Sequence, residues 1–154
     1  MNKAADATLQ PLADELAMLA ARLRDLAATP GADTPGRPLP RSERRYLALA
    51  RQVYALRRKR AAIFGNPELF GEPAWDILLD LYIAHAQAKS VSVSSACIGS
   101  AAPATTGLRW LGVLAEEGLV VRENDPEDNR RVLVRLTPKG IAAMERFFDA
   151  VESV

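Results

Sequence analysis

In the segment 91–136, residues that begin or end helices occur at spacings that few folds can accommodate. A short apolar stretch behind serines, which suit the start of a helix, stops at the break 101–103, where Pro103 can begin a second helix. That second helical pattern continues to about Glu117, and Gly118 suits its C-terminal end. The pattern predicts two helices joined at a tight corner and followed directly by extended chain.

The extended chain that follows predicts a β-hairpin. Its strands are expected at 119–122 and 131–136, and Asp125-Pro126 is suited to begin the polar turn between them. Two arginines, Arg130 and Arg131, lie at the tip. Alternation in the second strand predicts one apolar face, made of Val132, Val134 and Leu136.

Three further helical patterns precede this segment. They cover 11–28, then 42–64 with Ser42 as N-cap, and 73–89, which is apolar around most of its circumference and predicts a central core helix. Residues 29–40 hold four prolines and two glycines, which favour a linker. The expected parts are a striped helix with linker (1–40), a basic helix for dimerisation or support (41–64), and a domain with a short C-terminal helix (65–154).

Apolar residues spaced three and four apart mark the first helix as one that packs lengthwise against another helix. The same seam suits the chain's own second helix or a second subunit, and both interpretations stay open. The residues expected in a subunit contact are Leu12, Leu16, Leu19, Leu23 and Leu26, with Leu49, Val53 and Leu56 on the second helix.

Charge is distributed unevenly, although 20 basic and 19 acidic side chains leave a formal net charge of only +1. Residues 1–64 carry 12 basic and 6 acidic side chains and residues 65–154 carry 8 and 13, so the halves are about +6 and −5. Most of the positive charge lies between Arg41 and Arg60. That helix either adds positive potential near a polyanion or has a basic face that is solvated or paired with the acidic half.

Several classes of protein are excluded by what the sequence contains. Cys97 and His85 are the single cysteine and histidine, so neither an intrachain disulfide nor a conventional triad or zinc site is expected. No phosphate-binding loop or other catalytic motif occurs, and we expect no enzyme activity, no cofactor and no metal. Neither a secretory signal nor a membrane span is visible, which favours a cytoplasmic location. Cys97 is expected to be a packed thiol, not a redox sensor.

A helical wheel at about 100° per residue divides the helix from Pro103 into two sides. The inward side is expected to hold Ala104, Gly107, Leu108, Leu111, Leu114 and Ala115. The outward side shows Thr105, Thr106, Arg109 and Val113, with Trp110 at its edge. Arginine can pair with guanine, and threonine with phosphate or a thymine methyl, so the outward side suits a DNA major groove. An ordinary solvated helix face is the alternative.

Helix, corner, helix and an arginine-tipped hairpin together describe a winged helix-turn-helix. The fold class expected is therefore mainly α with a small β-hairpin, plus helical dimerisation elements. Arg130 and Arg131 would contact DNA backbone or minor groove. Asp125 would support the turn, and Asp128 would steady Arg130 by an ion pair.

The sequence resembles the MarR-type (multiple antibiotic resistance regulator) family in three runs, 114–122 (LAEEGLVVR), 125–131 (DPEDNRR) and 136–140 (LTPKG). Two features depart from the family pattern: Glu127 stands where the family commonly has arginine, and an N-terminal extension accompanies a C-terminus that we expect to lack one helix. The resemblance implies a homodimeric repressor that reads double-stranded DNA. It also implies an unidentified small-molecule effector, which we expect near Trp75, Tyr82 and Trp110.

A second function class fits the same residues. The winged domain would then be a protein interaction module that grips another regulator through its acidic surface and leucine stripe. Salt separates the two classes, because DNA binding built on phosphate neutralisation weakens steeply as salt is added.

Overall fold

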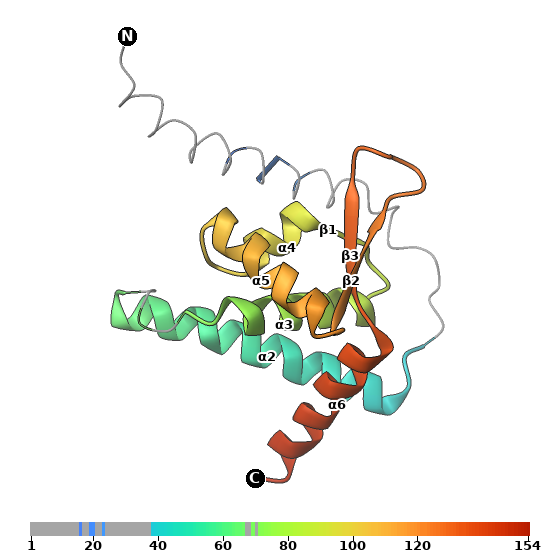
Figure 1. Ribbon diagram of the computed structural model, residues 1–154. Helices are drawn as coiled ribbons and strands as arrows, with labels where there is room; N and C mark the ends of the chain where they lie inside the picture. Colours follow the sequence, from blue (N-terminus) through green and yellow to red (C-terminus); the bar gives the residue numbers. More distant parts are fainter. Residues whose placement is uncertain (1–15, 17–18, 21–22, 24–37, 67–68, 70) are drawn as a thin grey trace.

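The computed structural model describes residues 16, 19, 20, 23, 38–66, 69 and 71–154, and Figure 1 shows their arrangement. The helices are α2 (Arg41–Phe64), α3 (Pro73–Ala86), α4 (Val93–Gly99), α5 (Ala104–Glu116) and α6 (Pro138–Glu152). The strands are β1 (Val91–Ser92), β2 (Val120–Asn124) and β3 (Val132–Leu136). None of the helices described is long and apolar enough to cross a membrane.

The three strands form one antiparallel sheet in the order β1, β3, β2. β2 and β3 are the predicted hairpin, paired from Val120 with Leu136 to Asn124 with Val132. The short strand β1 extends the prediction, since Val91 pairs with Val134 far along the chain. The prediction of a buried apolar face on β3 is only partly correct. Val134 and Leu136 are buried, but Val132 is exposed because it belongs to the last pair before the hairpin tip.

The arrangement is a winged helix-turn-helix, so the predicted fold class is confirmed. α3 is its central core helix, as expected, because four of its large apolar side chains are almost wholly buried. These are Ile77, Leu79, Leu81 and Tyr82. The Tyr82 ring meets Phe148 of α6 edge to face, with ring centroids 5.1 Å apart. Tyr46 and Ala50 bring α2 into the same core.

α2 begins two residues earlier than the predicted N-cap implies. Its N-cap is Pro40, not Ser42, and no side chain caps it. Proline has no side-chain acceptor, so the first turn is closed by the backbone, with Arg44 N donating to Pro40 O at 3.0 Å. The predicted end is confirmed: Gly65 stands at the C-cap with a left-handed φ of 72°.

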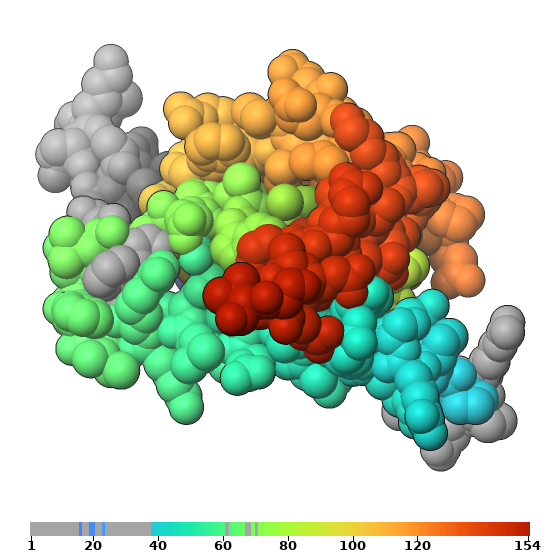
Figure 2. Space-filling model, turned by 90° about the horizontal axis from the view of Figure 1, so that it is seen from below, coloured from blue at the N-terminus to red at the C-terminus, as the bar shows by residue number. Residues whose placement is uncertain are grey.

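Ion pairs attach α2 to the rest of the domain. Arg57 donates to Asp76 of α3 at 2.6 Å, and Arg45 pairs with Asp149 of α6 at 3.1 Å. Figure 2 shows α6 lying across α2 on one face of the molecule. In Figure 1, by contrast, the hairpin tip projects from the opposite edge. Part of the basic helix therefore pairs with the acidic half, as one of the two interpretations anticipates.

The run 136–140 has a structural role at the junction of α5, the hairpin and α6. Thr137 is the N-cap of α6: its Oγ1 accepts from Gly140 N at 3.1 Å and donates to Gly118 O at 2.6 Å. Lys139 Nζ donates to Glu117 O, an orphan carbonyl at the end of α5, at 2.7 Å. These bonds fix the base of the hairpin relative to the end of α5.

The residues expected in a subunit contact are placed unequally. Leu12 and Leu26 lie outside the described residues. Leu16, Leu19, Leu23 and Leu56 are exposed, whereas Leu49 and Val53 are partly buried against the core of their own chain. The subunit contact remains a prediction.

Candidate nucleic-acid interface

The corner between α4 and α5 is built by buried polar contacts. Ser92, one of the serines expected to begin this helix, caps α4 by accepting from Ser95 N at 3.1 Å. Ser100 at the other end is fully buried; its Oγ donates to Cys97 O at 2.5 Å and accepts from Ala102 N at 3.3 Å. These bonds hold a corner in which Ala101 has the left-handed φ of 55°.

The rotation of α5 about its axis is fixed by its inward residues. Leu111 and Leu114 are buried in the core. Gly107 lies against α4 so closely that an added Cβ would be 3.1 Å from the Cα and Cβ atoms of Cys97. α5 therefore cannot turn without opening the core or separating from α4.

This rotation leaves the outward side of α5, the candidate reading face, directed away from the core. Thr105 and Arg109 are exposed on it, while Thr106 is partly buried. The predicted outward side is thus accessible, but one inward assignment is wrong: Leu108 is 47% exposed. It lies about 100° round the helix from Gly107, beyond the reach of the core that covers Leu111.

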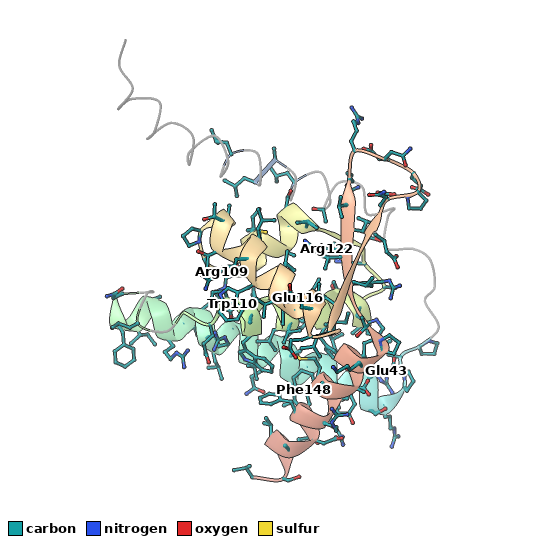
Figure 3. All side chains as sticks on the ribbon, viewed as in Figure 1. Glu43, Arg109, Trp110, Glu116, Arg122 and Phe148 are labelled. Atoms are coloured by element: carbon teal, nitrogen blue, oxygen red, sulfur yellow. The ribbon has the colours of Figure 1, made fainter. Side chains whose placement is uncertain are left out.

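Arg109 is available to a partner. It forms no ion pair with any residue in the described part of the chain, and its guanidinium carbon lies 5.7 Å from the centroid of the Trp110 ring. Trp110 itself is partly buried and packed against the core. Figure 3 shows the two side chains on α5. A cation–π contact at this distance is worth about 0.5–1 kcal/mol at an exposed site, so Trp110 orients Arg109 without neutralising it.

The hairpin turn is built around Asp125. Its Oδ1 accepts from Glu127 N at 2.9 Å, its backbone N donates to Arg131 O at 3.0 Å, and its Oδ2 lies 3.6 Å from Arg131 Nη1. Asp125 is buried although it is charged. It therefore supports the turn and holds Arg131, whose side chain is only 29% exposed.

Asp128 holds the other arginine of the tip. Its Oδ1 accepts from the backbone N of Arg130 at 3.1 Å and from Arg130 Nε at 3.2 Å. The hydrogen bond from the backbone of Arg130, followed by that from its side chain, lowers the pKa of the Asp128 carboxyl. The Arg130 side chain is 91% exposed. Of the two tip arginines, Arg130 is thus the one that projects into solvent.

Arg122 is a basic residue that sequence reasoning missed. It lies on β2, opposite Val134 on β3, and is exposed (Figure 3). Strand alternation places it on the same face of the hairpin as buried Val120, whereas Glu123 faces the other way and pairs with Arg135 at 2.7 Å. The sequence signal that could have identified Arg122 is the alternation of strand residues, which places positions 120, 122 and 124 on one face.

Acidic side chains border the same surface. Glu116 and Glu117 end α5, and Glu127 lies in the hairpin turn; all three are exposed. Their negative charges would oppose the arginines in any contact with a polyanion.

The three residues expected around an effector, Trp75, Tyr82 and Trp110, pack in or against the core. Trp75 meets Phe147 edge to face, with ring centroids 4.6 Å apart, and Tyr82 is buried in the core. A cavity of about 330 Å³ lies elsewhere, between the end of α3, β3 and the start of α6. Its lining includes Leu81, His85, Lys89, Leu133, Arg135 and Ile141.

Cys97 has the properties of a packed thiol. It is 1% exposed, and burial raises the pKa of its thiol to about 11. Within the described ranges, no cluster of three or more His, Cys, Asp and Glu side chains is arranged to hold a metal ion.

Residues 101–140 match the family model described as a winged helix DNA-binding domain. The matched segment contains the end of the corner, α5 and both strands of the hairpin. The chain matches none of the curated proteins with which it was compared.

Several solved structures show a similarity to this chain. A mutant of MepR from S. aureus is 21% identical, with 69% of this chain and 75% of that chain covered and a TM-score of 0.44. A mutant of MarR from E. coli is 20% identical, with 72% and 75% covered and a TM-score of 0.42. Another S. aureus MepR mutant, described as bound to an oligodeoxyribonucleotide, is 22% identical, with 70% and 79% covered and a TM-score of 0.44.

Proposed function

Because residues 101–140 match a winged helix DNA-binding domain, we propose that the chain is a MarR-type transcription regulator that reads double-stranded DNA by sequence. The observation that carries the proposal is exposed Arg109 on the outward face of α5, which has no ion pair with any described residue and lies beside exposed Thr105. The proposed action is binding, not catalysis.

In the proposed complex α5 enters the major groove. Arg109 pairs with O6 and N7 of a guanine, and Thr105 and Thr106 contact phosphate or base edges. Trp110 orients Arg109 from the edge of the face. On the hairpin, which acts as the wing, Arg130 contacts the flanking backbone or minor groove, while Asp125, Asp128 and Arg131 maintain the turn.

The proposal includes a homodimer that represses by occupying a promoter. A two-fold dimer places two copies of α5 in successive major grooves and doubles the arginine contacts, which offsets the acidic balance of residues 65–154. Exposed Leu16, Leu19, Leu23 and Leu56 support an apolar subunit contact. Ile63 and Phe64 add exposed apolar surface at the end of α2. Leu12, Leu26, Leu49 and Val53 belong to the same proposed seam.

The cavity of about 330 Å³ supports the proposed effector, because that volume suits a small organic molecule. β3 forms part of its wall through Leu133 and Arg135. A ligand in this position would contact a strand of the wing directly.

The test is selection of duplexes from random DNA by the full chain, followed by titration at several salt concentrations. We expect one symmetric preferred site and a steep loss of affinity with salt. Arg109→Ala should cost about 1–3 kcal/mol on that site. Arg51→Ala is the matched control, because Arg51 is an exposed arginine on α2, away from the reading face.

Two outcomes contradict the proposal. Equal losses from Arg109→Ala and Arg51→Ala would show that α5 does not read bases. Absence of duplex binding, together with tight and salt-insensitive binding of a protein partner, would favour the interaction module, for which the exposed apolar end of α2 offers a surface. The dimer is tested separately by the mass of the Leu19→Glu, Leu23→Glu variant in solution, which should be that of a monomer.

A further inference from the structure

Leu108 is an isolated apolar side chain on the reading face of α5. It is 47% exposed, although burying a leucine is favourable by about 1.5–3 kcal/mol in ordinary cores. One helical turn before it stands Ala104, and one turn after it stands Gly112. Leu108 therefore projects from its surroundings with no large apolar neighbour on the same row of the helix.

Gly112 has no explanation inside the domain. A Cβ added to it would meet nothing within 4 Å, so the fold leaves room for a side chain. Glycine in the middle of a helix makes the helix less stable than alanine would, and the backbone of Gly112 has no positive φ that would require a glycine. The other α5 glycine, Gly107, contrasts with it because α4 lies directly against it. A missing side chain on an outward face does permit the close approach of a partner from outside.

We propose that Leu108 and Gly112 determine specificity in the DNA complex: Gly112 lets the helix axis approach the floor of the major groove, and Leu108 contacts the C5-methyl group of a thymine. The thymine belongs next to the guanine read by Arg109, since Leu108 and Arg109 are consecutive on the exposed face. This inference rests on the proposed function and adds the base that the apolar residue recognises.

The chemistry of the groove favours thymine over cytosine at that position. Thymine presents a methyl group and an acceptor, whereas cytosine presents an amino donor in the major groove. A leucine side chain would cover that donor without accepting its hydrogen bond, which costs free energy. A methyl group instead gains from contact with leucine.

A protein partner is a poorer occupant of this surface. The exposed face of α5 also carries Thr105, Arg109 and Glu116, so its large exposed apolar side chains are limited to Leu108 and Val113. Protein interfaces need a larger contiguous patch.

The first test uses the preferred duplex and removes thymine methyl groups one at a time by substitution with deoxyuridine. At one thymine in each half-site we expect the affinity of the full chain to fall about fourfold, the effect of one lost methyl contact. Leu108→Ala should lower affinity for the thymine duplex by a similar or larger factor and then show no further loss with deoxyuridine. Val113→Ala, which truncates the exposed valine on the other flank, should retain the sensitivity.

The second test is Gly112→Ala. The variant should unfold at a higher temperature, because alanine is the better helix former, yet bind the preferred duplex about fivefold or more weakly, because the methyl group obstructs close approach. Unchanged affinity would overturn the role of Gly112.

The outcomes separate this inference from the proposed function. If Arg109→Ala weakens binding but no thymine is sensitive to deoxyuridine, or if Leu108→Ala remains fully sensitive, the Leu108 contact is wrong and the regulator stands. If the chain binds no duplex, both are wrong.

Discussion

Arg57 on α2 and Asp76 on α3 form a buried ion pair, in which Arg57 Nε lies 2.6 Å from Asp76 Oδ1 and Arg57 Nη2 lies 3.1 Å from Oδ2. The two side chains are only 11% and 8% exposed. Arg57 also pairs with Glu72, just before α3. Burial alone would lower the pKa of Arg57, but the hydrogen bonds to Asp76 and Glu72 outweigh it and raise the pKa. The ion pair thus fastens the basic helix to the centre of the winged domain.

Asp76→Ala should therefore destabilise the domain by about 3–5 kcal/mol, because it leaves a largely buried guanidinium with an exposed carboxylate as its remaining partner. Urea unfolding measures the change. Replacing both partners, as in Arg57→Met with Asp76→Leu, should recover most of the loss, since an apolar pair of similar volume carries no uncompensated charge. Equal destabilisation in the single and double variants would mean that the lost stability came from packing and not from charge.

Gly107→Ala should lower the stability of the domain by about 1–3 kcal/mol, because the new methyl group would lie 3.1 Å from Cys97 and from Ser100 Oγ. DNA affinity should fall as well, since α5 must shift to make room. Thermal unfolding and duplex titration measure the two effects. Gly112→Ala on the same helix is the control for alanine itself and should have the opposite effect on stability. A Gly107→Ala variant as stable as the parent would contradict the close crossing of α4 and α5.

The two arginines of the hairpin tip should respond differently to truncation. Arg130→Ala should weaken binding to all duplexes alike and reduce the salt slope by about 1, without changing the unfolding temperature, because its side chain is 91% exposed. Arg131→Ala should also loosen the turn, since Arg131 contacts buried Asp125. Amide hydrogen exchange of β2 and β3 should therefore quicken only in Arg131→Ala. Similar exchange in both variants would argue against a supporting role for Arg131.

Cys97 should be almost unreactive in the folded chain. Because burial raises the pKa of its thiol to about 11, only about one molecule in a thousand carries the thiolate at pH 8, and the fraction grows as the pH rises toward that value. Labelling with a thiol reagent should be slow at pH 8 and become fast in urea. Rapid labelling of the folded chain at neutral pH would revive a redox role for Cys97.

The order of the elements from 91 onward was predictable because its signals act over a few residues. Pro103 is the N-cap of α5, and Gly118, just after the end of that helix, has the left-handed φ of 72°. Asp125 accepts a hydrogen bond from the backbone of Glu127, two positions later. The same holds for Thr137, which caps α6 through Gly140. Each is decided by the conformational preference of the residue itself or by a neighbour in sequence.

The candidate interface was only partly predictable. A helical wheel identifies Arg109 and Thr105 as outward but cannot decide where the covered side ends, which is why it misplaced Leu108. That limit is set by how far α3 and α4 extend over α5. Arg122 was not predicted because the direction of a side chain on a strand can be assigned only when the pairing with the neighbouring strand, here β3, is known.

By itself the sequence determined which segments become helices and strands, and it supplied the arginine-bearing helix and hairpin of a winged domain. Tertiary structure alone decided that β1 joins the sheet and that Leu108 faces outward. It also decided that Arg57 pairs with Asp76, while Arg109 has no ion pair with a residue that the structure describes. The reason is physical. Helix ends and turns follow from local backbone preferences, whereas pairing and exposure depend on which distant surfaces bury Leu111 and Leu114 together.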